Sequence, residues 1–383
     1  MNKNDKFITF GEPLIGDEEI NDVVSVLKSG WLGTGPKVKI FENNFKDYKS
    51  ADHAIAVSSA TAALHLSLIC SNLKPGDEVI TTAMTFCSTV NAIIHSGATP
   101  VIVDIDFKTG NINPNDIDRA ITNKTKAIIP VHYSGIPCDM DAIMKIAHRN
   151  DLIVIEDCAH AIESEYKGKK IGTFGDFGCF SFYVTKNLAT GEGGMVITKS
   201  SEAAKRIKTL SLHGMNNDAW KRFSSDGYRH YKVEEAGYKY NMTDIQAAIG
   251  INQLVRLDKN WIKRKKIWEF YYDNLKKTNL MLPPRDDENN KFAYHLFPIL
   301  LNKKISISRD NLLIKLNNKG IGCGVHYESI PDHPFYQKEY GWKPENTPIA
   351  KLFGRSVLSL PITPVITNDD LDYIIKIITK YVS

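Results

Sequence analysis

Along roughly the first 255 residues, short aliphatic runs alternate with stretches whose apolar residues recur at helical spacing. The runs that we interpret as strands lie at 53–57, 78–82, 99–106, 126–133 and 151–157. Each run is nearly continuous in apolar residues, as expected for a strand that helices cover on both faces. The pattern predicts an α/β fold with a mostly parallel sheet flanked by helices.

The pattern changes after residue 255. A long helical stretch, VRLDKNWIKRKKIWEFYYDNL, is followed by FAYHLFPILL, a helix near 308–319, GIGCGVHY and a last helix in LDYIIKIITKYV. We therefore expect a large α/β domain over residues 1–260 and a smaller C-terminal α+β domain over residues 261–383. The basic cluster at 263–266 lies between apolar residues, so we interpret it as the solvent-facing side of a helix.

Composition narrows the class of protein. The 383 residues are 43% hydrophobic and 24% charged, and 48 basic against 44 acidic residues give a net charge of +4. Such a balance argues against nucleic acid or a membrane surface as a partner. The six cysteines form no CxxC pair and no HExxH motif occurs, so we expect reduced cysteines and no metal site. With no apolar signal segment and no run of membrane-spanning length, we expect a cytoplasmic protein.

One candidate site is an anion-binding turn. The stretch SSATAALHL (58–66) ends a strand and begins a helix. The free N–H groups at a helix start favour an anion, and Ser59, Ala60 and Thr61 are small enough for a phosphate to approach the backbone. Ordinary N-capping by serine is the alternative.

Three further candidates follow other strands of the predicted sheet, where ligands of open α/β sheets bind. Asp157 ends the run LIVIED, where it either caps a helix or meets a cation such as a pyridinium nitrogen. Phe86 either belongs to the core or stacks on a flat ring. Lys186 follows GCFSFY and is either a solvated residue or a desolvated amine that attacks carbonyls. Together these groups are what pyridoxal 5'-phosphate (PLP) requires.

Longer segments carry a family resemblance: SSATAALHLSL, TFCSTVNAIIHSGATPVIVDID, VIEDCAHAIES, GTFGDFGCFSFYVTKNLATGEGGMVIT and YKYNMTDIQAAIGINQL. They closely resemble the DegT/DnrJ/StrS-type nucleotide-sugar aminotransferases. The similarity extends from residue 31 to residue 364, and the block TKNLATGEGG (185–194) is its most specific part. The resemblance implies the aspartate-aminotransferase-like fold, which is fold type I of the PLP-dependent transferases.

The resemblance implies roles for particular residues. Lys186 matches the lysine that carries PLP and moves the proton, and Asp157 matches the partner of the ring nitrogen. The other cofactor positions are Phe86 for stacking, His160 beside the ring oxygen, and Ala60, Thr61 and Ser181 for the phosphate.

The segment GYKYNMTDIQ approaches the neighbouring subunit's active site in this family, which implies a homodimer. Many members have Asn at the position of Lys239, where it touches the cofactor phosphate. Here we carry that role to Asn241, and Lys239 is the competing assignment.

The resemblance also implies the reaction. An amino group moves from glutamate, leaving 2-oxoglutarate, to a nucleotide-linked ketosugar that serves cell-surface glycan synthesis, such as that of lipopolysaccharide O-antigen. His160 in EDCAHAIES resembles the members that aminate C4 of a 4-keto-6-deoxyhexose, whereas C3-aminating members more often have Gln there. The stretches that flank substrate in similar proteins contain Trp31, Thr34, Arg229, His326 and Tyr327.

Several alternatives remain open. For Arg229 a surface salt bridge competes with a substrate contact, and amination at C3 competes with C4. A regulatory protein that binds PLP without turnover is a further alternative. Dehydratase-like relatives resemble this family with His at the lysine position, so Lys186 argues against them.

Overall fold

The computed structural model describes residues 7–215 and 231–382. Its main sheet has the strand order β1-β9-β8-β5-β4-β2-β3. The strands are β1 (His53–Val57), β2 (Glu78–Thr82), β3 (Thr99–Val103), β4 (Thr125–Ile129), β5 (Ile153–Asp157), β8 (Phe177–Ser181) and β9 (Gly194–Thr198). Only β9 is antiparallel to its neighbours, so the other strands of the sheet all run in one direction. The expectation of a mostly parallel sheet is confirmed.

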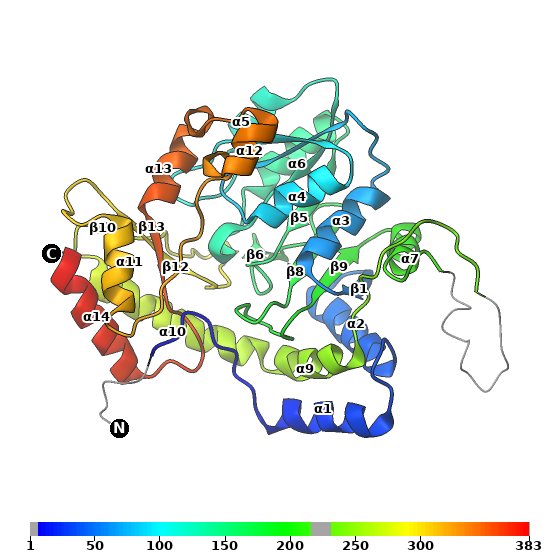
Figure 1. The fold of residues 1–383 in the computed structure, drawn as a ribbon, viewed down its shortest axis with the longest axis horizontal. Coiled ribbons are helices and arrows are strands. Elements are labelled where there is room, and N and C mark those ends of the chain that lie inside the picture. The colour runs from blue at the N-terminus through cyan, green and yellow to red at the C-terminus, as the bar shows by residue number, and fades with distance from the viewer. Residues whose placement is uncertain (1–6, 216–230, 383) are drawn as a thin grey trace.

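Helices cover both faces of this sheet (Figure 1). One face packs against α3 (Ala60–Cys70), α4 (Cys87–His95) and α7 (Ser201–Leu210). The other packs against α2 (Pro36–Lys49), α5 (Pro114–Ala120), α6 (Met140–Arg149) and α9 (Asp244–Val255), and α1 (Asp17–Ser29) lies on α9. Because successive strand residues face opposite sides, Val79 enters one core and Ile80 the other. This explains the continuous apolar runs.

The third predicted strand, 99–106, is shorter than expected. β3 ends at Val103, because Asp104 turns its carboxylate to the N-terminus of α13 (Pro348–Ser356). There it accepts hydrogen bonds from the N–H groups of Ile349 (2.9 Å) and Ala350 (2.8 Å). A contact 245 residues away in sequence thus sets the end of the strand.

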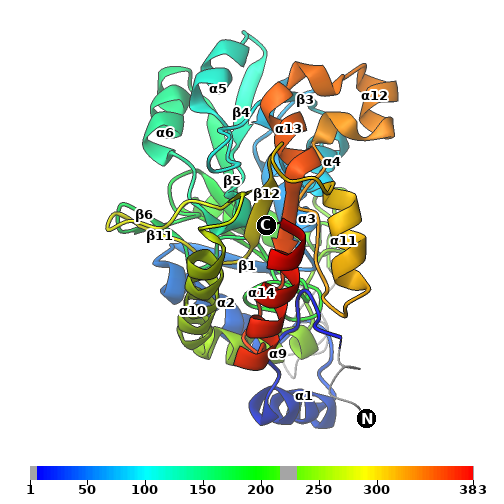
Figure 2. The same ribbon diagram turned by 90° about the vertical axis from the view of Figure 1, so that its left-hand side faces the viewer.

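The C-terminal part builds its own sheet and core (Figure 2). Its antiparallel sheet has the order β10-β12-β13, with β10 (Leu280–Met281), β12 (Phe297–Leu301) and β13 (Val357–Leu360). The helices α10 (Leu257–Leu275), α11 (Arg309–Asn317) and α14 (Asn368–Val382) share a core with it. The short helix α12 (Pro334–Tyr340) lies near α4. The division at residue 260 stays a prediction, since α10 begins just before it.

A third, small sheet joins the two parts. It contains β6 (Glu165–Tyr166), β7 (Lys169–Lys170) and β11 (Asn290–Lys291), in the order β11-β6-β7. Short 3-10 turns occur at Tyr133–Gly135, Ile330–Asp332 and Pro344–Asn346.

The solvent-facing interpretation of residues 263–266 is wrong for one of them. Arg264 is only 3% exposed, and its Nη1 donates a hydrogen bond of 2.7 Å to the carbonyl oxygen of Ile362. Burial lowers its pKa to about 10, and the carboxylate of Glu163 opposes that shift. Lys266, by contrast, is exposed as expected.

None of the helices in the described residues is long and apolar enough to cross a lipid bilayer.

Candidate active site at the carboxyl ends of the strands

A cavity of about 520 Å³ lies at the carboxyl ends of the parallel strands. Most of the residues predicted to bind the cofactor line it, together with two of the predicted substrate residues: Ala60, Thr61, Phe86, Asp157, His160, Ser181, Lys186, His326 and Tyr327. The order of the strands explains this gathering, because β1, β8, β5, β4 and β2 are consecutive or nearly so in the sheet and end at this edge.

The start of α3 forms one side of the cavity. Ser59 is the N-cap, and its Oγ accepts a hydrogen bond of 3.1 Å from the N–H of Ala62. The predicted serine cap is therefore present. It leaves the N–H groups of Ala60 and Thr61 without an acceptor among the described residues, so this helix start can still bind an anion.

Glycine allows this helix start to lie beside β9. A Cβ atom on Gly194 would be 2.5 Å from the carbonyl carbon of Ser59 and 2.7 Å from the nitrogen of Ala60. No side chain fits in that space. Gly194, the last glycine of the GEGG motif, therefore allows the end of β8 and the start of α3 to lie together around one cavity.

Asp157 is the last residue of β5 and is 4% exposed. Its Oδ2 accepts from Thr89 Oγ1 (2.8 Å) and its Oδ1 accepts from the N–H of Ala159 (3.1 Å). Burial raises the pKa of this carboxyl, and the two hydrogen bonds and the nearby Lys186 offset the rise only in part. A cation placed in the cavity would complete its surroundings.

Lys186 is presented by a turn, not by a strand. β8 ends at Ser181, and the N–H of Lys186 closes the turn on the carbonyl oxygen of Tyr183 (2.8 Å). Burial lowers the pKa of the Lys186 amine to about 8, although Asp157 acts in the opposite direction. Within the described part of the chain its Nζ has no hydrogen-bond partner. A partly deprotonated, unengaged amine is suited to attack a carbonyl group.

His160 and Tyr327 form a polar pair on the cavity wall. The Nδ1 of His160 accepts from the N–H of Ser134 (3.2 Å), so its Nε2 carries the proton and donates to the hydroxyl oxygen of Tyr327 (2.9 Å). Burial and the neighbouring Lys186 hold the pKa of His160 well below its usual value. The imidazole is therefore neutral, and the hydroxyl proton of Tyr327 is free for a ligand.

Phe86 and His326 complete this wall. Phe86 is the N-cap residue of α4 and is 57% exposed, with its ring centroid 6.0 Å from that of Tyr327. It is therefore not part of the core, which was the alternative. His326 stacks on Phe10 at 5.0 Å, and its Nδ1 is 3.0 Å from Ser359 Oγ.

The remaining predicted residues gather elsewhere. Asn241 Nδ2 donates to Thr34 Oγ1 (2.8 Å), and Trp31 Nε1 donates to the carbonyl oxygen of Thr34 (3.1 Å). Lys239 pairs through its backbone with Leu212. None of the three residues Trp31, Thr34 and Asn241 is among the described residues that line the cavity of the same chain. Arg229 lies outside the described residues.

Sequence reasoning missed several residues that shape the site. Thr89 fixes the carboxylate of Asp157, and Ser134 fixes the tautomer of His160. Thr89 could have been predicted from the sequence, since it lies one helical turn after Phe86 in TFCSTV. Ser134 gave no signal, because its backbone N–H makes the contact.

A second group of titratable residues, His132, Glu156 and Cys158, also lies close together. The carboxylate of Glu156 already accepts four hydrogen bonds, from His132 Nε2 and the N–H groups of Gly172, Phe174 and Gly175. These donors occupy the lone pairs that a metal ion would need, so we interpret the group as structural.

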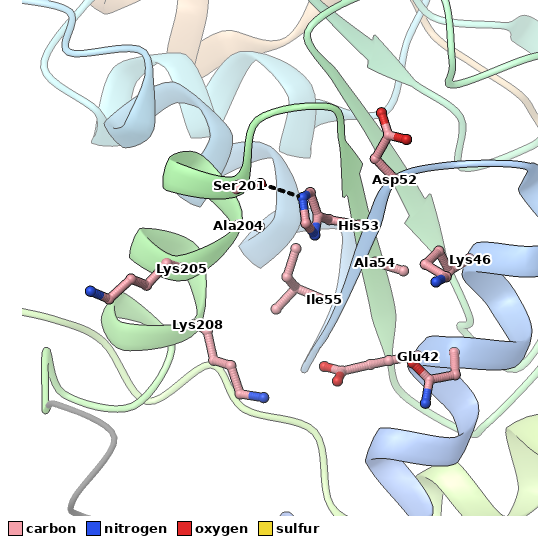
Figure 3. Close-up of a pocket in the computed structure, with 11 residues that line it drawn as sticks. Glu42, Lys46, Asp52, His53, Ala54, Ile55, Ser201, Ala204, Lys205 and Lys208 are labelled. Atoms are coloured by element: carbon pink, nitrogen blue, oxygen red, sulfur yellow. Dashed lines mark hydrogen bonds between the residues drawn. The ribbon is translucent and has the colours of Figure 1, made fainter.

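A second hollow, of about 530 Å³, lies beside the amino end of β1 (Figure 3). It surrounds His53, the first residue of β1, whose Nε2 is 2.9 Å from Ser201 Oγ. Lysines of α2 and α7 alternate around it with acids such as Glu42. The hollow shares no lining residue with the first cavity, which alone brings together the amine, the acid and the helix start.

The residues around the first cavity fit PLP. The unengaged N–H groups of α3 suit its phosphate, Asp157 suits a cationic ring nitrogen, and Lys186 suits its aldehyde. The exposed ring of Phe86 offers a flat surface, and the pair of His160 and Tyr327 offers hydrogen bonds to a ring oxygen.

Comparison with known proteins agrees with this fit. The profile of the DegT/DnrJ/EryC1/StrS aminotransferase family matches residues 13–379. The spore coat polysaccharide biosynthesis protein SpsC of Bacillus subtilis is 45% identical over 384 residues, which cover 100% of this chain and 99% of SpsC.

Solved structures extend the comparison. The putative sugar aminotransferase Spr1654 from Streptococcus pneumoniae, in its PMP form, is 34% identical, with a TM-score of 0.92 over 98% of each chain. A PLP form of the same protein is also similar. PseC of Helicobacter pylori, an aminotransferase involved in the biosynthesis of pseudoaminic acid, is 29% identical, with a TM-score of 0.90 over 98% of this chain and 99% of PseC. The chain therefore belongs to the DegT/DnrJ/EryC1/StrS aminotransferase family and is a PLP-dependent aminotransferase.

Proposed function

We propose that this enzyme transfers an amino group from glutamate to a nucleotide-linked ketosugar, at C4 of a 4-keto-6-deoxyhexose. The observation that carries the proposal is the single cavity in which Lys186, Asp157 and the start of α3 meet. The names of SpsC and Spr1654 support a sugar as the acceptor. The product then serves the synthesis of a cell-surface glycan.

Lys186 is the proton carrier in this proposal. When bound, PLP supplies an aldehyde for exchange of amines and a ring that accepts the electron pair released at the substrate carbon. A pKa of about 8 leaves part of the Lys186 amine unprotonated near neutral pH, so that its Nζ can take a proton from one carbon and return it to another. Both halves of the reaction use this same amine.

The other residues bind and orient. Asp157 keeps the ring nitrogen protonated, and Thr89 holds the carboxylate in place for that task. The N–H groups of Ala60 and Thr61, with Ser181, bind the phosphate. The neutral His160 holds the Tyr327 hydroxyl, which donates to an oxygen in the cavity.

We also propose that the enzyme is a homodimer in the cytoplasm. Trp31, Thr34 and Asn241 are joined by hydrogen bonds but line no part of their own chain's cavity, which supports a role at the partner's cavity. All six cysteines are free, which supports a reducing compartment.

The test is a substrate panel. The purified enzyme is incubated with glutamate and with 4-keto-6-deoxyhexoses linked to UDP, dTDP or GDP, and separately with the 3-keto isomers. Mass spectrometry detects amination, and NMR of the product locates the new C–N bond. We expect amination at C4. Amination of the 3-keto compounds alone would support the C3 alternative. Failure of glutamate alone to convert the bound cofactor aldehyde to the amine would point to a binding protein.

A further inference from the structure

Behind the cavity wall, a chain of buried polar side chains connects the turn of Lys186 to His160. Asn187 directly follows Lys186 and is 6% exposed. Its Nδ2 donates to both carboxylate oxygens of Glu163 (3.0 and 2.9 Å) and to the carbonyl oxygen of Ala293 (2.8 Å), and its Oδ1 accepts from His295 Nδ1 (3.0 Å). Every polar atom of this amide is therefore engaged.

The chemistry of the partners fixes the orientation of the Asn187 amide. The reverse orientation would place Oδ1 against the carboxylate of Glu163 and the carbonyl oxygen of Ala293, which are both acceptors. With Oδ1 facing His295, the Nδ1 of His295 must carry a proton. Burial, with the nearby His160 and Lys186, holds the pKa of His295 well below its usual value, so the ring is neutral.

His295 connects Asn187 to the cavity wall through a contact with His160. Its ring centroid is 4.4 Å from that of His160, at an interplanar angle of 36°. The next residue in the chain, Leu296, accepts a hydrogen bond at its carbonyl oxygen from Ser134 Oγ (3.2 Å), and the N–H of Ser134 donates to His160. Two routes thus lead from His295 to the same imidazole.

Glu163 closes the far end of the chain. It is 2% exposed, and burial raises its pKa to about 7. The charged groups that face it are Arg264 of α10, Lys291 of β11 and Lys49 of α2. No ion pair within 4.0 Å joins any of these to Glu163 in the described residues, so both carboxylate oxygens are left to Asn187.

We propose that Glu163, Asn187 and His295 are positioning residues. Glu163 holds the Asn187 amide, and this amide fixes both the turn that presents Lys186 and the imidazole ring of His295, against which His160 packs. This inference rests on the proposed role of Lys186. The alternative is that the chain merely satisfies buried polar groups and contributes stability alone.

The test measures the Lys186 amine in the full-length protein freed of cofactor. PLP is added briefly at a series of pH values, the adduct is fixed with borohydride, and peptide mass spectrometry quantifies modification of Lys186. For the wild type we expect a rate that rises with pH to a midpoint near 8. In Asn187→Ala the turn is no longer held and water reaches the amine, so we expect the midpoint to rise by about one pH unit and the rate at neutral pH to fall about tenfold.

Two variants separate positioning from stability. Glu163→Gln keeps an oxygen that accepts from Asn187 and is expected to keep the wild-type midpoint, whereas Glu163→Leu removes the acceptor and should behave like Asn187→Ala. Ser164→Ala is the matched control. It removes a buried hydrogen bond of 2.7 Å to the carbonyl oxygen of Gly135, close to these residues, but does not touch Asn187.

The outcomes are distinct. If wild-type Lys186 forms no adduct, the proposed function itself fails. The inference is overturned if wild-type Lys186 forms the adduct while both Asn187→Ala and Glu163→Leu keep the wild-type midpoint. In that case Glu163, Asn187 and His295 have only a structural role. A shift of the same size in Ser164→Ala would overturn it as well. Should Asn187→Ala not fold, the comparison of Glu163→Leu with Glu163→Gln decides alone.

Discussion

Glu156 and Asp157 are consecutive residues at the end of β5, and both are buried, yet their surroundings differ. Glu156 accepts four hydrogen bonds, three of them from backbone N–H groups. Burial alone would raise its pKa, but the hydrogen bond and charge of His132 and these N–H groups lower it. The Asp157 carboxylate accepts two hydrogen bonds, one from the Thr89 hydroxyl and one from the N–H of Ala159, and burial raises its pKa.

The difference separates two uses of a buried acid. Protein hydrogen-bond donors occupy both oxygens of the Glu156 carboxylate, which connects β5 to the loop that contains Gly172 and Gly175. The carboxylate of Asp157 is left short of positive charge and lines a cavity that it shares with Lys186. Burial is common to both, so it marks neither as functional. What marks Asp157 is the missing cation, which a bound cofactor would supply under the proposed function.

The largest effect that the comparison predicts lies at the lysine that faces Asp157. We expect Lys186→Ala to reduce turnover by at least about 10⁴-fold, because the nucleophile and the proton carrier are lost together. The borohydride-reducible adduct should also disappear, which mass spectrometry of the treated protein measures. Near-normal transamination by this variant would refute the assigned role.

Asp157→Asn tests the functional side of the pair. We expect the rate to fall about a thousandfold, roughly 4 kcal/mol of barrier, because an amide cannot hold the ring nitrogen protonated. The cofactor-free protein should gain stability above the native pKa of Asp157, since a neutral side chain suits this buried position better than a charge. Steady-state kinetics and thermal unfolding measure the two quantities. A variant with more than about a tenth of the wild-type activity, a loss below about 1.4 kcal/mol, would make Asp157 a structural cap.

Glu156→Gln should give the reverse pattern. Its amide NH₂ group would face backbone N–H donors, and we expect a loss of about 3 kcal/mol in the free energy of unfolding. The rate per folded molecule should change by less than about threefold, under 1 kcal/mol of barrier. Denaturant titration and active-site counting with borohydride separate the two effects. Unchanged stability together with a large loss of rate would contradict the comparison.

The sequence allowed the sheet, most of the cavity and Asp157 to be predicted, because apolar runs locate strands and strand ends locate ligand sites. It could not distinguish the surroundings of Glu156 from those of Asp157, since the backbone donors to Glu156 lie 16 to 19 residues later in a loop. Arg264 was expected in solvent because the basic cluster at 263–266 lies between apolar residues. In the structure it donates to the carbonyl oxygen of Ile362 and is attracted by the charge of Glu163. Such contacts depend on tertiary packing, which helical spacing does not encode.

The smallest predicted effect is the opposite pH dependence of the two acids in the cofactor-free protein. Glu156 has a lowered native pKa, so the unfolded state binds more protons below pH 4.5, and its contribution to stability is lost as pH falls through the native value. Asp157 has a raised native pKa, so the native state binds more protons above pH 3.8, and its contribution declines as pH rises through that window.

The measurement is the free energy of unfolding against pH, for the wild type and for the two variants. Relative to the wild type, the loss of unfolding free energy in Glu156→Gln should be smallest at the acid end. The gain of unfolding free energy in Asp157→Asn should be largest above the native pKa of Asp157. Each unit of pKa shift corresponds to about 1.4 kcal/mol. Differences of the same sign for both variants would show that the two carboxylates occupy equivalent surroundings. Addition of PLP should remove the gain of Asp157→Asn and leave the loss of Glu156→Gln unchanged, because the ring nitrogen then supplies the cation that Asp157 lacks.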